Sequence, residues 1–87
     1  MNVKMRVSVR YFASIREALG SVEQCEVAVG SSLGELRDQL IASSPAHAAA
    51  LARGRAVRGA VNQSLCAETE VLAEGAEVAF FPPVTGG

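Results

Sequence analysis

Apolar and polar residues alternate strictly at the start of the chain. A period of two places every second side chain on the same face of a strand. We therefore predict a strand over residues 3–11 with one buried face. Phe12 breaks the alternation at the end of this strand and is expected to face outward. The apolar positions of the strand are Val3, Met5, Val7, Val9 and Tyr11.

A short helix and a second strand are predicted to follow. Residues 14–20 are consistent with a helical turn or short helix that ends at Gly20, because glycine is common just past a helix C-terminus. Cys25, Val27 and Val29 then restore the alternation, which predicts the second strand.

The middle of the chain carries the signature of a helix start. Ser32 and Glu35 have the spacing of a capping box, in which each side chain accepts a hydrogen bond from the backbone of the other residue. Apolar residues then recur at helical spacing, which predicts an amphipathic helix. Pro45 either ends this helix or begins a second one, and residues 48–52 are candidates for a short second helix that stops at Gly54. The apolar stripe consists of Leu33, Leu36, Leu40 and Ile41.

The last third of the chain predicts three more strands. They are expected over residues 57–61, within residues 65–71 and over residues 77–81, and the last is almost entirely apolar, as in a central strand. The order strand, strand, helix, strand, short strand, strand implies an α+β fold. In it, one main helix packs across a mixed sheet of about five strands. The first and last strands can then lie side by side in parallel, which is the ubiquitin-like β-grasp arrangement.

Composition and charge narrow the possible functions. The 87 residues are 49% hydrophobic and 20% charged, which is typical of one small globular domain without room for a deep substrate pocket. A binding or carrier role is therefore favoured over a self-contained enzyme. We assign residues 1–82 to the β-grasp domain and residues 83–87 to a flexible C-terminal tail.

Several partners and compartments are disfavoured. A net charge of −1 argues against nucleic acid, and the only local basic group, Arg53, Arg55 and Arg58, is expected to be a solvated surface. No apolar run reaches the roughly 20 residues of a membrane span, and the alternation from Val3 onward is unlike a signal peptide. We expect a cytoplasmic protein that binds neither nucleic acid nor membrane.

The side chains that commonly carry chemistry are few. Cys25 and Cys66 are far apart and form no CxxC pair, so we interpret them as small buried hydrophobes. His47, the only histidine, has no partner in its alanine-rich surroundings and is expected at the surface. Metal sites need more ligands than the chain offers, so no metal is expected.

The C-terminal tail is the remaining candidate. Pro82 cannot donate to a sheet and must stop the last strand near Phe81, and Pro82-Pro83 favours a stiff extended backbone. Residues 84–87 span at most about 14 Å, and the tip, Gly86-Gly87, has no side chains to hinder entry into a narrow channel. A terminal carboxylate becomes reactive as a mixed anhydride with AMP, from which a sulfur nucleophile can form a thiocarboxylate. A frayed end that happens to carry two glycines is the alternative.

Three segments of the sequence resemble the small subunit of molybdopterin synthase, a family of ubiquitin-like sulfur carriers. They are residues 10–17 (RYFASIRE), residues 60–65 (AVNQSL) and residues 74–87 (EGAEVAFFPPVTGG). The Phe-Pro-Pro-Val-x-Gly-Gly ending is the most specific of them, whereas residues 43–55 carry little family signal.

The resemblance implies a carrier subunit, itself non-catalytic, of a sulfurtransferase. Gly87 would be adenylated by an ATP-consuming adenylyltransferase related to ubiquitin-activating enzymes and converted to a thiocarboxylate, with no cofactor bound to the carrier. The tail residues Pro82, Pro83, Val84, Thr85 and Gly86 would enter the active site of the large subunit, within a heterotetramer. Sulfur would pass there to cyclic pyranopterin monophosphate to form the dithiolene of molybdopterin.

The resemblance also implies an apolar docking surface on the carrier, formed by Phe12, Leu65 and Phe81. Plain core packing is the alternative for Phe12 and Leu65. Three other functions share parts of the pattern: a sulfur carrier for thiamine thiazole synthesis, a ubiquitin-like modifier of lysines, and a β-grasp interaction module with an inert tail.

Overall fold

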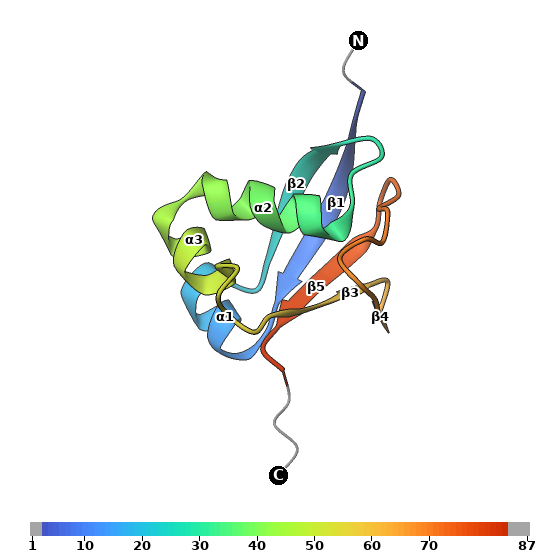
Figure 1. The fold of residues 1–87 in the computed structure, drawn as a ribbon. Helices are drawn as coiled ribbons and strands as arrows, with labels where there is room; N and C mark the ends of the chain where they lie inside the picture. Colours follow the sequence, from blue (N-terminus) through green and yellow to red (C-terminus); the bar gives the residue numbers. More distant parts are fainter. Residues whose placement is uncertain (1–2, 84–87) are drawn as a thin grey trace.

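The computed structural model describes residues 3–83, which form one five-stranded mixed sheet with three helices on one of its faces (Figure 1). The strand order is β2-β1-β5-β3-β4, in which β1 and β5 are parallel and the other neighbouring pairs are antiparallel. The predicted α+β, ubiquitin-like β-grasp architecture is confirmed, with three helices in place of one main helix. In chain order the elements are β1 (Lys4–Tyr11), α1 (Ala13–Leu19), β2 (Val22–Ala28), α2 (Leu33–Ser43), α3 (Pro45–Leu51), β3 (Arg58–Val61), β4 (Ser64–Leu65) and β5 (Glu77–Phe81).

The core lies between the sheet and the helices, and β5 contributes to it from the middle of the sheet. Val78 and Phe80 of β5 are almost completely buried. Because side chains alternate across a strand, Glu77, Ala79 and Phe81 must point to the opposite face, which the helices leave open. On β1 the same alternation buries the predicted apolar positions Met5, Val7, Val9 and Tyr11.

Helix α2 begins as predicted. The backbone N–H of Ser32 donates to Glu35 Oε1 at 2.8 Å, and the N–H of Glu35 donates to Ser32 Oγ at 3.2 Å. The structure also decides between the two roles considered for Pro45. This residue begins α3, where the missing N–H of proline costs nothing because the first turn has no acceptor for it.

Three strand predictions are corrected. Val3, predicted on the buried face of the first strand, lies before β1 and is 63% exposed. Val29 lies beyond the end of β2 and is 60% exposed, and the short strand predicted within residues 65–71 is only β4. The residues after β4 turn away from the sheet because their carbonyl groups bind the start of α2. The N–H of Leu33 donates to Glu70 O at 2.8 Å, and that of Gly34 donates to Glu68 O at 2.9 Å.

A buried arginine on α2 ties this helix to the chain that leads into β3. The Arg37 side chain is 5% exposed, and its guanidinium donates to Leu51 O at 2.8 Å and Ala52 O at 2.7 Å. It also pairs with Glu68 at 2.8 Å. Arg37 follows Leu33 by four residues and precedes Leu40 by three, so its place on the buried stripe was visible in the sequence.

The sequence led us to expect Arg53 on a solvated surface without specific contacts. The structure contradicts this expectation for Arg53. It pairs with Asp38 at 2.9 Å and with Glu68, and it donates to Gly34 O at 3.0 Å. The hydrogen bond from Arg53, followed by that from Arg37, lowers the pKa of the Glu68 carboxyl. Two arginines therefore share one carboxylate and fix the connection between α3 and β3.

Replacing Arg37 by methionine is expected to lower the free energy of unfolding by about 2–4 kcal/mol, because buried carbonyl groups lose their charged donor. Urea denaturation followed by circular dichroism measures this loss. The matched control is Arg16→Met on the exposed surface of α1, for which we expect a change below about 0.5 kcal/mol. Equal, small losses in the two variants would show that Arg37 does not hold the fold together.

Candidate functional site

The open face of the sheet carries an apolar patch near the end of β5. We call the residues Phe12, Ala60, Leu65, Ala79 and Phe81 the docking patch. The strand register brings them together, because Ala60 lies opposite both Ala79 of β5 and Leu65 of β4. Phe81 follows Ala79 by two residues and therefore shares its face. The patch thus draws on segments that are far apart in the sequence.

Phe12 is held at the edge of this patch. It is 41% exposed, and its N–H donates to Phe80 O at 3.2 Å. Ala13, the next residue, has φ of 54°, a conformation that residues other than glycine rarely adopt. This conformation, at the first residue of α1, turns the chain sharply after the strand and lets the Phe12 ring stay outside the core. The expectation that Phe12 faces outward is confirmed, and core packing is excluded for it.

A small hollow of about 80 Å³ lies against the Phe12 ring. Ala79 forms part of its wall, and Gln63 lies at its rim. Arg10 and Glu77 form an ion pair at 3.0 Å beside it. The hollow therefore combines apolar surface with neutralised charge, as expected of a site that a partner side chain can fill.

Leu65 is 65% exposed, so core packing is excluded for it as well. It follows the tight turn of the β3–β4 hairpin, in which Asn62 and Gln63 have φ of 49° and 70°. The turn is fastened to β5, since the N–H of Asn62 donates to Glu77 O at 2.7 Å and Asn62 Oδ1 accepts from the N–H of Glu77 at 3.0 Å. This fastening fixes where Leu65 stands relative to Phe81.

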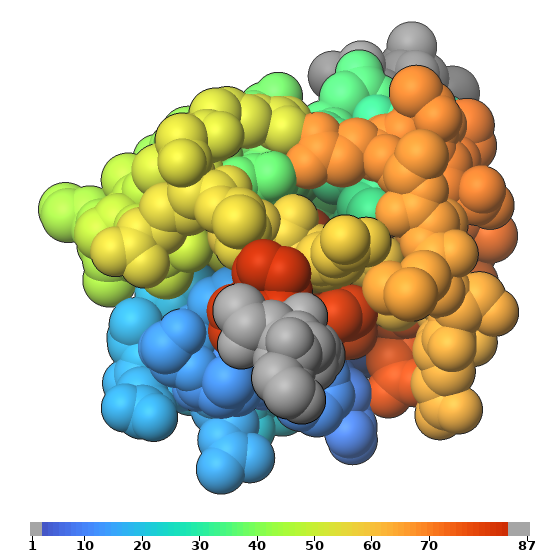
Figure 2. Space-filling model, turned by 60° about the horizontal axis from the view of Figure 1, so that its bottom comes forward, coloured from blue at the N-terminus to red at the C-terminus, as the bar shows by residue number. Residues whose placement is uncertain are grey.

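The strand that carries Phe81 ends there, as the two prolines predict. Pro82 and Pro83 are half-buried and leave the body of the protein beside α1 and the connection between α3 and β3 (Figures 1 and 2). The other predicted tail residues, Val84, Thr85, Gly86 and Gly87, lie outside the described residues, so their roles stay predictions. The structure does establish that the base of the tail adjoins the docking patch.

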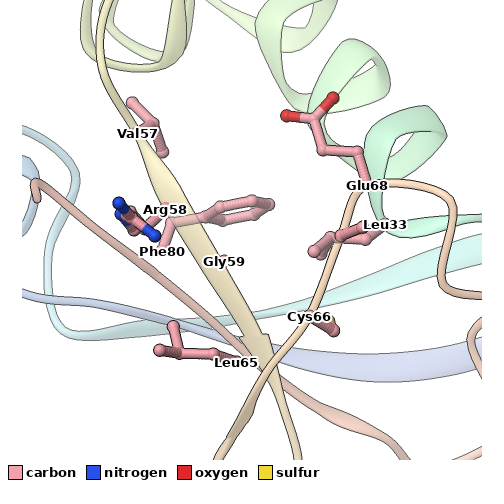
Figure 3. Close-up of a pocket in the computed structure, with 9 residues that line it drawn as sticks. Leu33, Val57, Arg58, Gly59, Leu65, Cys66, Glu68 and Phe80 are labelled. Atoms are coloured by element: carbon pink, nitrogen blue, oxygen red, sulfur yellow. The ribbon is translucent and has the colours of Figure 1, made fainter.

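A cavity of about 410 Å³ opens between β3 and the residues that follow β4 (Figure 3). Leu33 reaches toward Gly59 there, and a Cβ atom on Gly59 would lie 2.6 Å from Leu33 Cδ2. Only glycine therefore lets β3 approach α2 this closely. Leu65 also lines the cavity, so the cavity continues the docking patch around the edge of the sheet.

Neither cysteine has the properties of a sulfur nucleophile. Burial, followed by the nearby Glu23 charge, raises the pKa of Cys25 to about 11. Burial also raises the pKa of Cys66, and Glu70 adds to this effect. With these raised pKa values, both side chains are protonated at neutral pH. The thiolate, which is the reactive form of cysteine, is therefore scarce. Both cysteines are half-buried and pack against the core, close to the prediction of small buried hydrophobes.

His47 is not a free surface residue, and this prediction was wrong. Its ring is 17% exposed, with Nε2 at 2.7 Å from Glu23 Oε2 and Nδ1 at 2.6 Å from Ser44 Oγ. The Tyr11 hydroxyl donates to the same Glu23 oxygen at 2.7 Å, and burial, followed by this hydrogen bond, raises the Tyr11 pKa. The pairing joins α3 to β2, a contact that no local pattern in the sequence reveals.

These polar groups do not form a reactive centre. The Ser44 hydroxyl already accepts from the N–H of His47 at 3.1 Å as the cap of α3, so the polar groups of this cluster hydrogen-bond to one another.

No group of three or more His, Cys, Asp or Glu side chains within residues 3–83 is arranged to hold a metal ion. Among the helices of the same residues, none has the length and apolar character required to cross a membrane.

Sequence comparisons identify relatives over nearly the whole chain. The model of the ThiS family matches residues 9–87. The molybdopterin synthase sulfur carrier subunit of Escherichia coli is 44% identical over 82 residues, which cover 93% of this chain and 99% of the relative. The protein of the same name from Mycobacterium tuberculosis is 40% identical, with coverage of 95% and 99%.

Solved structures show the same fold. A putative molybdopterin converting factor subunit 1 from Pyrococcus furiosus superposes with a TM-score of 0.79 at 27% identity, covering 92% of this chain and 99% of that one. Small archaeal modifier protein SAMP1 from Haloferax volcanii has a TM-score of 0.76 at 28% identity, with coverage of 94% and 99%. A chain from the complex of subunits 1 and 2 of the molybdopterin-converting factor of Helicobacter pylori has a TM-score of 0.63 at 28% identity, with coverage of 95% and 100%.

The sequence matches span almost the full length of the chain, and they include the three segments on which the resemblance rests. The chain belongs to the ThiS family and, within it, to the molybdopterin synthase sulfur carrier subunits.

Proposed function

We propose that this protein delivers sulfur to the large subunit of molybdopterin synthase through a thiocarboxylate on Gly87. The observation that carries the proposal is the position of β5. This strand is central in the sheet, presents Phe81 on the open face and leads directly into the Pro-Pro-Val-Thr-Gly-Gly ending. Docking of the patch and delivery of the tail are thereby coupled through one strand.

The chemistry requires no catalytic side chain on the carrier. An oxygen of the Gly87 carboxylate attacks the α-phosphorus of ATP and releases pyrophosphate, which gives an acyl adenylate. A sulfur nucleophile then attacks the acyl carbon and displaces AMP, which leaves the thiocarboxylate. The partners are an adenylyltransferase related to ubiquitin-activating enzymes for this activation and the large subunit for transfer to cyclic pyranopterin monophosphate. The protonated thiols of Cys25 and Cys66 agree with a role in which neither cysteine carries the sulfur.

The docking patch supplies the affinity that the tail lacks. Fixing each tail residue costs about 1–2 kcal/mol of conformational entropy, so contacts on the body of the carrier must offset this cost. Phe12 and Leu65 are large apolar side chains left exposed beside the tail, and such residues are typical anchors of protein interfaces. The Helicobacter pylori complex supports a two-subunit assembly. A cytoplasmic location accords with this function and stays a prediction.

A modifier function is the second candidate, because SAMP1 of Haloferax volcanii shares the fold. The same activated Gly87 would then form isopeptide bonds with lysines. The curated relatives favour the sulfur carrier, since they match at 40–44% identity under that name.

Deletion of Gly87 is expected to abolish sulfur transfer while leaving the fold intact, because the reactive carboxylate would sit one residue short of the partner's reacting atoms. An added residue after Gly87 should have the same effect for the converse reason. The measurement is molybdopterin formation by the reconstituted synthase, with circular dichroism and large-subunit binding as controls for folding and docking. A Gly87-deleted carrier that still supported molybdopterin formation would refute the proposed role of the tip.

Leu65→Ala is expected to weaken binding to the large subunit about 30-fold, or about 2 kcal/mol, if Leu65 fills a desolvated pocket on the partner. Calorimetry measures the dissociation constant. Val71→Ala is the matched control, since Val71 is 61% exposed but pairs with Ser32 at the start of α2, away from the patch. We expect its binding to stay within about twofold of the parent chain. Similar losses in both variants would mean that the patch is not the docking surface.

A further inference from the structure

About half of the charged side chains cancel in ion pairs, and those that remain are unevenly distributed. Arg6 pairs with Glu26, Arg10 with Glu77, and Arg37 and Arg53 with Glu68 and Asp38. Four exposed cations have no ion-pair partner within the described part of the chain: Lys4, Arg16, Arg55 and Arg58. Their places in the fold decide what they can contact.

Three of these cations, Arg16, Arg55 and Arg58, lie on segments near the end of β5, and we call them the tail-end arginines. Arg58 begins β3 and lies opposite Phe81 in the strand register. Arg16 lies on α1. Arg55 lies in the connection between α3 and β3, where it lines a shallow hollow together with Ser14 of α1. In Figure 2 the segments that carry these residues, α1 in blue and the chain leading into β3 in yellow, border the red end of the described chain.

The opposite end of the molecule has the opposite charge. Exposed Glu70 and Glu74 lie in the loop that precedes β5, and Glu35 lies in the first turn of α2. This loop contacts the start of β1, because the N–H of Gly75 donates to Arg6 O at 2.8 Å. Lys4 is the only cation there without an ion-pair partner in residues 3–83, so this end has a balance of −2.

The two balances make the protein an electric dipole along the direction of the tail. At the tail end, the three arginines stand against two carboxylates, those of Glu17 and Glu23, which gives a balance of +1 when His47, the partner of Glu23, is counted as neutral. A net charge of only −1 hides this asymmetry. A dipole of this kind orients a protein during diffusional encounter with a charged partner. An acidic partner surface would draw the carrier in with the tail first.

The tail-end arginines cannot serve the chemistry at the tip. Residues 84–87 span up to about 14 Å when extended, so the base of an inserted tail remains at the entrance of the partner's channel. The arginines therefore meet the surface around that entrance. An arginine there fits a carboxylate, which it can bind through two parallel hydrogen bonds.

We infer that the tail-end arginines dock against an acidic rim around the tail channel of the large subunit and steer the tail toward it. This inference rests on the proposed function and adds to it the charge of the partner surface. Steering acts mainly on the association rate, whereas the apolar patch acts mainly on the dissociation rate.

The test compares two charge reversals with the same change in net charge. Arg58→Glu acts at the tail end, and Lys4→Glu acts at the opposite end of the same sheet. The association rate with the large subunit from the same organism is measured by stopped flow in low and high salt. At about 0.01 M salt, where screening reaches about 30 Å, Arg58→Glu should slow association about three- to tenfold and Lys4→Glu less than twofold. At about 1 M salt the two variants and the parent chain should agree.

Three results would overturn the inference. Equal association rates of the two variants at low salt would show that the tail-end arginines do not steer the encounter. Faster association of Arg58→Glu would mean that the rim is basic. Slower association of Arg58→Glu with the activating enzyme alone would assign the arginines to that partner instead. Arg55→Glu repeats the test in a second position and guards against a folding defect in one variant. Intact molybdopterin formation by the variants at high protein concentration would keep the proposed function standing in each case.

Discussion

Strand β5 is hydrogen-bonded on both edges, in parallel to β1 and antiparallel to β3, and the position of every residue of the candidate site depends on these two ladders. The pairing with β3 places Phe81 beside Arg58 and aligns Ala79 with Ala60 and so with Leu65. The pairing with β1 sets Phe80 beside Tyr11 and thereby places Phe12, the next residue, near Phe81. Because both neighbours hold β5, the point where the tail leaves the body is fixed relative to the docking patch. A carrier that delivers its C-terminus to a partner needs this rigid reference.

The structure separates stability from function with little overlap. The stabilising polar contacts lie on the side of the sheet that the helices cover. There Arg37 hydrogen-bonds to Glu68, and Glu23 accepts from Tyr11 and pairs with His47. The open face and the tail end carry exposed apolar and cationic groups that have no stabilising partner in residues 3–83. The half-buried thiols of Cys25 and Cys66 have raised pKa values. Under the proposed function, the protein acts by presenting its C-terminus, and the partner supplies the catalytic residues.

The sequence predicted the features that depend on local order. The alternation from Val3, the capping box at Ser32 and the diproline at Pro82 each act over a few residues, so β1, α2 and the end of β5 were predictable. Features created by contacts between distant segments were not. His47 looked free because its partner Glu23 lies 24 residues earlier in the chain. A short strand was expected within residues 65–71, although the carbonyl groups of Glu68 and Glu70 bind the start of α2. The segments that carry the tail-end arginines likewise come near one another only because α1 and β3 both contact β5.

The central claim is that the terminal carboxylate of this protein is the group that carries sulfur. The most direct test is the intact mass of the carrier after incubation with its activating enzyme, ATP and a sulfur donor. The account predicts a mass increase equal to the replacement of one oxygen by sulfur, located by fragmentation to Gly87. An unchanged mass with all components active, or conjugates with lysines of other proteins in its place, would contradict the account.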